Sequence, residues 1–452
     1  MNNNRFDRRK FIAYLLSISA LAVAGNSCLA NASPLKNIRV VVIGAGCSGL
    51  AAARALANKG AAVTVIEGKP NIGGRLLTDW SMNAPFEVGA GWIHGPEKSN
   101  PIRQLADAVS AQYKITDDDN LTVFNSDGEE MDNERLEEID KSWHYALQHL
   151  DDNLENDNTQ SIREALSNKL SDEDLEWAMS AYTEFSTGGS IAKISALLHD
   201  DGKVFDGDDV VVTTGYDELL KPLAKGLDIK LSTVVSEISY TDTDSNVKTN
   251  NGNFDADYVI CSVSLGVLKA GTIKFTPPLP PSFQNSIKKI GFGTVTKIAL
   301  KFEETFWDID TQYFGMVTQP KGRWNYWMNY RTFSDENILL GVSVGDYALT
   351  ADEMTDTDIT KDALTVLRDV WKINVGEPTE MLRTSWHNDP FSLGAYAFPT
   401  PGIKKSQFDS LSEPIQNRLL LCGEHTSFNY LGTTHGAYLS GIRAAEYVIN
   451  HI

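Results

Sequence analysis

Residues 38–49 read IRVVVIGAGCSG, and residues 50–67 continue as LAAARALANKGAAVTVIE. The β-branched run from Ile38 to Ile43 predicts a strand that is buried on both faces. The glycine-rich turn Gly44–Gly49 leads into an alanine- and leucine-rich segment that predicts a helix, and Gly60 is expected to end it. The run Ala62–Ile66 predicts a second strand, which finishes at Glu67. This order is that of a β-α-β unit with two parallel strands.

The glycines of the turn have the spacing of a dinucleotide-binding motif. Gly44 would make the turn, Gly46 would let the backbone approach a pyrophosphate, and Gly49 would allow close packing of helix on strand. The N-terminus of the following helix offers unpaired N–H groups to phosphate. Glu67 follows at the distance where a carboxylate accepts hydrogen bonds from ribose hydroxyls. Strand, turn, helix, strand and acid together predict a dinucleotide site.

Composition excludes several other classes of protein. The 452 residues include 60 acidic and 40 basic side chains, a net charge of −20, which argues against a nucleic-acid binder with a basic face. The length predicts about two to three domains. Cys47, Cys261 and Cys422 are scattered through apolar or glycine-rich sequence, so we expect buried thiols and neither disulfides nor a metal site.

Residues 1–32 have the features of an export signal. Arg8-Arg9-Lys10 precedes an apolar stretch that runs to Gly25, and Ala30-Asn31-Ala32 provides a small-x-small cleavage site. The arginine pair followed by Phe11 resembles a twin-arginine signal, which exports folded proteins; Asp7 stands where Ser or Thr is usual. An ordinary secretory signal and an uncleaved anchor are the alternatives. We expect a periplasmic or secreted protein with no stable membrane insertion after cleavage, since no apolar run reaches about 18 residues.

Further motifs follow the first one in a characteristic order. Asn71-Ile72-Gly73-Gly74-Arg75 adds a glycine pair and a guanidinium that suit the same pyrophosphate. The later segments are 86–96, 215–220, 229–238 (read as one strand), 257–268, 291–297, 386–396, 419–426 and 432–438. In this order they resemble the flavin-containing amine oxidase family, which includes polyamine oxidases, monoamine oxidases and lysine-specific histone demethylases. The resemblance covers nearly all of the chain after residue 32.

The resemblance implies an α/β fold of the amine oxidase / p-hydroxybenzoate hydroxylase-like type. A discontinuous Rossmann-type FAD-binding domain would comprise residues 35–98, 205–275 and 405–452. A substrate-binding domain of mostly antiparallel sheet plus helices would comprise residues 99–204 and 276–404. These bounds are expectations taken from the order of the motifs.

The resemblance also assigns the cofactor and the residues that hold it. Glu424 would bind the ribityl chain of FAD, and the helix after Gly432 would direct its positive dipole at the pyrimidine end of the flavin. Ala395 stands where monoamine oxidases have the cysteine that attaches flavin, so non-covalent FAD is expected. The predicted cofactor-binding residues are Gly44, Gly46, Ser48, Gly49, Glu67, Gly74, Arg75, Gly91, Trp92, Val235, Glu424, Thr433 and Thr434.

Lys297 is the first candidate for catalysis. It lies in the apolar segment Val295–Phe302, where the desolvation of an ammonium must be compensated; the alternative is a lysine that extends to solvent from a strand edge. In the family this lysine holds a water beside flavin N5. The predicted catalytic residues are Lys297, Tyr396, His94 and Trp386, and the predicted substrate-binding residues are His94, Glu184, Phe185 and Tyr396.

Several of these residues have more than one interpretation. Glu184 is expected either to pair with a distal ammonium of a polyamine or to be simply exposed. His94 either hydrogen-bonds an amine nitrogen or is structural. Tyr396 and Trp386 would present aromatic faces to the amine, whereas Thr433 replaces the second tyrosine that monoamine oxidases use.

The predicted activity is FAD-dependent oxidation of a polyamine-like amine, with hydride transfer to flavin N5. The partners would be the amine and O2, and the products an aldehyde, a shorter amine and H2O2. An L-amino-acid or other secondary-amine oxidase is one alternative; it requires an arginine for the carboxylate, and Arg323 is the candidate. A dehydrogenase with another electron acceptor, and a catalytically idle polyamine-binding flavoprotein, are the others. Oligomeric state is not predicted.

Overall fold

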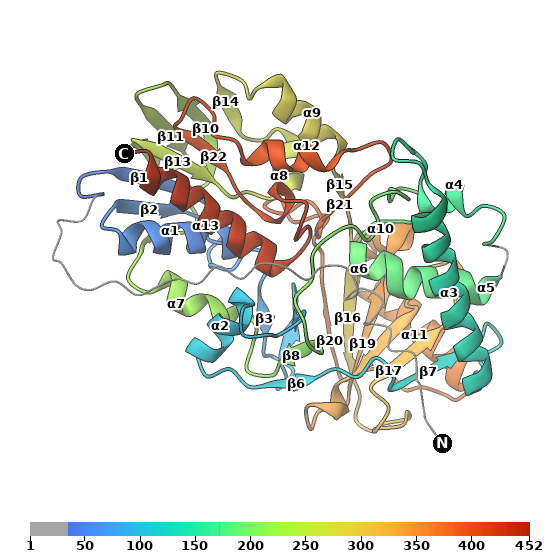
Figure 1. Cartoon of the computed structure of the whole chain (residues 1–452). Coiled ribbons are helices and arrows are strands. Elements are labelled where there is room, and N and C mark those ends of the chain that lie inside the picture. The colour runs from blue at the N-terminus through green and yellow to red at the C-terminus, as the bar shows by residue number, and fades with distance from the viewer. Residues whose placement is uncertain (1–34, 171) are drawn as a thin grey trace.

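The computed structural model describes residues 35–170 and 172–452. The predicted signal, residues 1–32, lies outside this part of the chain. Figure 1 shows a mixed α/β molecule with two large sheets, which confirms the predicted fold class. The residue bounds of the two domains stay a prediction.

One sheet is entirely parallel and is assembled from distant parts of the sequence. Its five strands have the order β22-β13-β1-β2-β9. They are β22 (Leu419–Leu421), β13 (Tyr258–Cys261), β1 (Arg39–Ile43), β2 (Ala62–Ile66) and β9 (Asp228–Lys230). Helices α1 (Cys47–Asn58) and α13 (Thr434–Asn450) pack side by side on this sheet (Figure 1). Leu50, Leu56 and Val448 are buried between them, so the apolar helix faces form the core here.

The expectation of one strand over residues 229–238 is wrong. β9 ends at Lys230, and a separate strand, β10 (Val235–Tyr240), belongs to another sheet of order β12-β11-β10-β14. Ser232 between them has φ 50°, a left-handed conformation that cannot continue a strand. The apolar pattern is similar on both sides of this turn, so the sequence alone did not show the break.

The second large sheet has six strands in the order β20-β16-β19-β18-β17-β7. Its pairs are antiparallel except β17–β7, as expected for a mostly antiparallel sheet. The strands are β20 (Glu380–Arg383), β16 (Thr296–Lys301), β19 (Ile338–Ser343), β18 (Tyr326–Asn329), β17 (Tyr313–Met316) and β7 (Leu121–Phe124).

Alternation along β16 decides which way Lys297 faces. Ile298 and Leu300 are in the apolar cluster that contains helix α11 (Asp356–Trp371). Ala299 is in the cluster on the opposite face, together with Phe86. Because side chains of a strand alternate, Lys297 shares the face of Ala299 and points toward the segment that carries Phe86.

Other elements complete the molecule. The strands are β3 (Thr78–Asp79), β4 (Phe86–Glu87), β5 (Trp92–Ile93), β6 (Tyr113–Ile115), β8 (Val210–Val212), β11 (Ser245–Thr249), β12 (Gly252–Ala256), β14 (Lys274–Thr276), β15 (Gly291–Phe292) and β21 (Ala397–Phe398). The helices are α2 (Pro101–Ala108), α3 (Asn133–Asn153), α4 (Ile162–Ala165), α5 (Glu173–Ala178), α6 (Phe185–Thr187), α7 (Lys221–Ala224), α8 (Leu265–Ala270), α9 (Pro281–Lys289), α10 (Gly345–Glu353) and α12 (Lys405–Asp409). A π-helical turn, Met179–Glu184, joins α5 to α6. Within residues 35–170 and 172–452, no helix has the length and apolarity that crossing a membrane requires.

Candidate active site and cofactor cradle

The glycine turn between β1 and α1 has the geometry that the motif predicts. Gly44 has φ 100°, a conformation that L side chains rarely adopt. A Cβ on Gly49 would lie 2.0 Å from the carbonyl oxygen of Gly44, so helix and strand approach too closely for any side chain there. A Cβ on Gly46, in contrast, would meet only the carbonyl oxygen of Gly73, at 3.7 Å. Gly46 is therefore the glycine of the turn whose face is open to a ligand.

The second glycine pair lies against the first turn. Gly46 and Gly73 form a parallel bridge, and the Gly73 N–H donates to the Ala45 carbonyl at 2.9 Å. Glu67 is buried at the end of β2, where its carboxylate accepts from the backbone N–H groups of Ala45 at 2.7 Å and Lys69 at 2.8 Å. The turn that precedes Val235 reaches the same place, since the Thr233 N–H donates to the Glu67 carbonyl.

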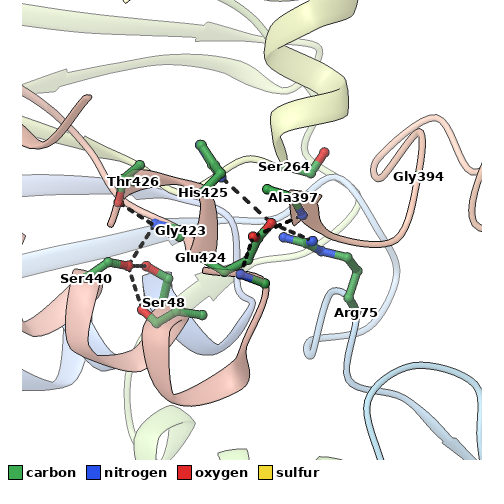
Figure 2. A network of polar contacts seen from close by, with 12 residues as sticks. Ser48, Arg75, Ser264, Gly394, Ala397, Gly423, Glu424, His425, Thr426 and Ser440 are labelled. Atoms are coloured by element: carbon green, nitrogen blue, oxygen red, sulfur yellow. Dashed lines mark hydrogen bonds and ion pairs between the residues drawn. The ribbon is translucent and has the colours of Figure 1, made fainter. Parts of the chain in front are cut away.

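A buried ion pair joins the second glycine segment to the C-terminal segment (Figure 2). Arg75 Nη1 lies 2.9 Å from Glu424 Oε1, and Glu424 is only 4% exposed. Arg75 Nη1 also donates to the Ala395 carbonyl at 2.5 Å, while Glu424 Oε2 accepts from the Ala397 N–H at 3.3 Å. The two members of one ion pair thus hold the backbone on both sides of Tyr396.

The N-termini of α1 and α13 meet beside this pair. Ser48 Oγ lies 3.0 Å from Ser440 Oγ, which also accepts from the Gly423 N–H at 2.8 Å (Figure 2). Cys47 Sγ contacts the carbonyl oxygen of Thr434, the first residue of α13. Thr433 is the N-cap of α13, because its hydroxyl accepts from the Gly436 N–H at 2.9 Å. Thr433, which replaces the second tyrosine of monoamine oxidases, therefore caps a helix in this protein.

These residues fit a dinucleotide such as FAD. The N-terminus of α1 has no side-chain cap, so its first N–H groups can bind phosphate. Gly46 leaves room for that phosphate, and Glu67 places a buried carboxylate at the end of the neighbouring strand. The two helix N-termini and Arg75 supply positive potential, while Glu424 supplies an acceptor. The roles of the individual residues toward the cofactor stay predictions.

Lys297 is buried and donates hydrogen bonds to backbone carbonyls. The side chain is 7% exposed, and Nζ donates to the carbonyl oxygens of Glu87 at 3.0 Å and Gly89 at 2.5 Å. β16 is flanked by β19 and β20, so the alternative of a lysine extending from a strand edge is wrong. Burial lowers the pKa of Lys297 to about 8, against the opposing charge of Glu87.

Glu87 is a residue of this site that the sequence reasoning missed. Its carboxylate is buried and accepts from Thr78 Oγ1 at 2.8 Å and the Tyr216 N–H at 2.9 Å. Burial raises the pKa of Glu87 to about 8, partly offset by these hydrogen bonds and by Lys297. An acid between two apolar residues, Phe86 and Val88, immediately before a glycine loop was the available signal.

The ammonium of Lys297 lies beside the ring of Trp92, which belongs to a connected group of aromatic side chains. Nζ lies 5.7 Å from the centre of the Trp92 ring. The Trp92 and Phe185 rings meet edge to face, with their centres 6.1 Å apart. The Tyr396 hydroxyl donates to the Phe185 carbonyl. Trp386 is buried, and its Nε1 donates to the Val88 carbonyl at 2.8 Å, in the same loop. The structure therefore links Lys297, Trp92, Phe185 and Tyr396 through successive contacts, and Trp386 hydrogen-bonds to the loop that holds Lys297.

Other predicted residues lie in different environments. The His94 side chain is 60% exposed, with Nδ1 2.8 Å from Asp209 Oδ2. The alternative of an exposed Glu184 is wrong: its side chain has no exposed surface and forms an ion pair with Lys321. Arg323 is held by Asp362, with Nη2 2.7 Å from Oδ1, so this guanidinium is not a free carboxylate clamp. Cys47, Cys261 and Cys422 are buried free thiols, as expected.

Among residues 35–170 and 172–452, no group of three or more His, Cys, Asp or Glu side chains could hold a metal ion.

Comparison with known proteins agrees with this geometry. Residues 47–449 match the family model described as "Flavin containing amine oxidoreductase". Polyamine oxidase 4 of Oryza sativa subsp. japonica is 30% identical over 430 residues, which cover 90% of this chain and 88% of that protein. Polyamine oxidase 2 of Arabidopsis thaliana is 31% identical over 430 residues, which cover 90% and 87%. Lysine-specific histone demethylase 1 homolog 3 of Arabidopsis thaliana is 30% identical, but the match covers only 30% of its length.

The fold is also that of a solved flavoenzyme. The structure of wild-type putrescine oxidase bound to putrescine superposes with a TM-score of 0.77 at 20% identity, over 92% of this chain and 100% of that chain. A likeness at this identity supports the fold alone. The family match over residues 47–449, with relatives at about 30% identity over most of their length, shows that this chain belongs to the flavin-containing amine oxidoreductases and is a flavin-dependent amine oxidase that uses FAD.

Proposed function

We propose that the protein oxidises polyamine-like amines at a carbon–nitrogen bond, with non-covalently bound FAD and O2 as the final acceptor. The overall reaction would convert RCH2–NHR′, O2 and H2O into RCHO, R′NH2 and H2O2. FAD, when bound, supplies the acceptor for the hydride that leaves the carbon. The relatives named polyamine oxidases support the substrate class.

The observation that carries this proposal is the position of Lys297. Its ammonium lies on a buried face between the Trp92 ring and the carbonyls of Glu87 and Gly89. A group held this firmly is suited to fix a water beside the reacting atoms. Ala395 offers no thiol for attachment of a flavin, which supports a non-covalent cofactor.

The aromatic side chains would orient the amine. Trp92, Phe185 and Tyr396 form one connected group, and ring faces attract cations before the reacting nitrogen loses its proton. Tyr396 is held on both sides by the Arg75–Glu424 pair, so its orientation is coupled to the cofactor cradle. Only a neutral amine has the lone pair that assists departure of the hydride, so the site must accept the deprotonated nitrogen.

An amino-acid oxidase is the less favoured function on this fold. It would require a cation for the substrate carboxylate, and the candidate, Arg323, is already paired with Asp362. We also propose export of the folded holoprotein to the periplasm or beyond. The arginine pair and the apolar stretch of residues 1–32 support that proposal.

The test is a substrate panel on purified holoprotein. Putrescine, spermidine, spermine, N-acetylated polyamines, benzylamine and L-amino acids would each be supplied without and then with air. We expect anaerobic loss of the yellow absorption with at least one polyamine, and one H2O2 per amine consumed in air. Reaction only with an amino acid or an aryl amine would contradict the substrate class, and amine loss without peroxide would point to another electron acceptor. A yellow protein that no amine bleaches would be an idle flavoprotein.

A further inference from the structure

The carboxylate of Glu184 is the most deeply buried charge beside the aromatic group. It is the last residue of the π-helical turn Met179–Glu184, and none of its side chain is exposed. A buried carboxylate is costly unless it is paired and hydrogen-bonded. Oε1 meets both requirements within the protein: it pairs with the Lys321 ammonium and accepts from the Ile191 N–H at 2.8 Å. A substrate ammonium is therefore not needed to neutralise it.

The residues that follow Glu184 contact Tyr396 directly. The Phe185 carbonyl accepts from the Tyr396 hydroxyl. Gly188 has φ 71°, its N–H donates to the Glu184 carbonyl at 2.8 Å, and a Cβ on it would lie 2.6 Å from the Tyr396 ring. The short segment from Glu184 to Gly188 thus packs against both the hydroxyl end and the face of Tyr396.

The carboxylate ties this segment to two parts of the six-stranded sheet. Lys321 lies in the connection between β17 and β18. Gly345 begins α10 after β19, and a Cβ on it would lie 2.6 Å from Glu184 Oε2, so the backbone of α10 approaches the carboxylate closely. Oε2 has no hydrogen-bond partner among the residues that the structure describes. π-helical turns are inherently irregular, so a tertiary contact that fixes one has direct structural value.

We propose that Glu184, through its ion pair with Lys321, is a positioning residue for Phe185 and Tyr396 and not a ligand for a distal ammonium. The inference rests on the proposed function, because it concerns the two aromatic residues that would orient the amine. Glu184 would then be neither exposed nor in contact with substrate, and it would act through the two aromatic residues that it positions.

The ion pair predicts an asymmetry between its two partners. Lys321 is 24% exposed and lies 3.8 Å from Glu176, so it keeps a partner and solvent when Glu184 becomes neutral. Once Lys321 is removed, Glu184 keeps the hydrogen bond from the Ile191 N–H, but it loses its ion pair and has no contact with solvent. Lys321→Met should therefore disturb the segment more than Glu184→Gln, and the double variant, which buries no unpaired charge, should recover part of the loss.

The experiment compares holoprotein variants Glu184→Gln, Lys321→Met and the double variant with Lys193→Met. Lys193 is a matched control, since it is a lysine in an exposed ion pair with Asp346, a residue of α10, the helix whose first residue approaches Glu184. Anaerobic flavin bleaching would be measured with a diamine and with a monoamine of equal chain length, and crystal structures would report the Tyr396–Phe185 contact.

Positioning predicts that Lys321→Met slows bleaching by about 10–100-fold with both amines alike, with little change in the amine concentration for half-maximal rate. The double variant should be faster than Lys321→Met, Lys193→Met should match the wild type, and the Tyr396–Phe185 contact should be broken in Lys321→Met. A loss confined to the diamine in Glu184→Gln would show that Glu184 binds the distal ammonium. Unchanged ring positions in Lys321→Met would also overturn the proposal.

The structural readout separates this inference from the proposed function. If no amine bleaches the wild type, the function fails, whereas displaced Phe185 and Tyr396 rings in Lys321→Met would still support the positioning role. If amines bleach every variant at the wild-type rate, the positioning role fails and the function stands.

Discussion

Lys297 Nζ donates to the carbonyl oxygen of Gly89 at 2.5 Å and so joins β16, an inner strand of the six-stranded sheet, to the glycine loop that carries Trp92. A second bond, to the Glu87 carbonyl at 3.0 Å, fixes the ammonium between two neighbouring carbonyls. The lysine is thereby held without a carboxylate in direct contact. This arrangement keeps one donor direction of the ammonium for a further acceptor, such as water.

Lys297→Met should separate catalysis from binding. The thioether is similar in length and apolar, so the buried position should tolerate it, but the donor is lost. We expect the variant to bind FAD and to bleach with amine at least about 100-fold more slowly, the range of a lost proton-handling or water-positioning group. Stopped-flow absorption under anaerobic conditions measures this. A wild-type rate would remove Lys297 from the catalytic residues.

Glu87 should make stability depend on pH. Its pKa is raised from 4.5 to about 8 in the folded protein, so the folded state retains a proton that the unfolded state loses. The stabilisation is present in full below about pH 4.5 and is lost as pH rises toward 8. Glu87→Gln removes this dependence. The wild type should lose at least about 1.4 kcal/mol relative to the variant between pH 5 and 8, the equivalent of one pKa unit.

Thermal unfolding of both holoproteins across this range gives the comparison. The lowered pKa of Lys297 affects stability only at higher pH, where it makes stability rise between pH 8 and 10.5. The measurements should therefore stop near pH 8. Parallel curves for wild type and Glu87→Gln would show that Glu87 is ionised in the folded protein at all of these pH values.

Two glycine substitutions in one turn should have different effects. Gly49→Ala places a Cβ 2.0 Å from the Gly44 carbonyl, so it should destabilise the fold whether or not FAD is present. Gly46→Ala meets only an oxygen at 3.7 Å, so the protein should fold but bind FAD more weakly. Circular dichroism and FAD titration of the two variants distinguish these results. Full FAD affinity in a folded Gly46→Ala would argue against pyrophosphate at Gly46.

The flavin should be released when the protein unfolds. Ala395 has no nucleophilic side chain, and Cys47, Cys261 and Cys422 are buried thiols whose pKa burial raises, so they are poor nucleophiles. Acid precipitation of the holoprotein should leave all of the yellow colour in the supernatant. Colour that remains with the pellet after washing would demonstrate a covalent bond elsewhere.

The arginine pair should determine export. Replacing Arg8 and Arg9 together by lysine keeps the charge but removes the pair that a twin-arginine pathway requires. We expect the variant to stay in the cytoplasm of a bacterial host while the unaltered chain reaches the periplasm, as measured by fractionation and immunoblot. Export of both would favour an ordinary secretory signal.

The sequence by itself determined the parts of this protein that depend on neighbouring residues. The β-α-β unit of residues 38–67 and the roles of Gly44 and Gly49 depend on backbone conformation and local apolar patterning, whereas the antiparallel character of the second sheet was expected from the family resemblance. The sequence also marked Lys297 as unusual, because the desolvation of an ammonium within the largely apolar segment Val295–Phe302 must be compensated, but it left a strand-edge lysine as the alternative.

Tertiary structure decided which distant groups became partners. Glu184 meets Lys321, Glu87 supports the loop that holds Lys297, and Arg323 is paired with Asp362, each across a long sequence separation. The break between β9 and β10 was likewise set by the two sheets to which these strands belong. Such pairings depend on how whole elements pack, and the desolvation of a charge is known only once its surroundings are in place.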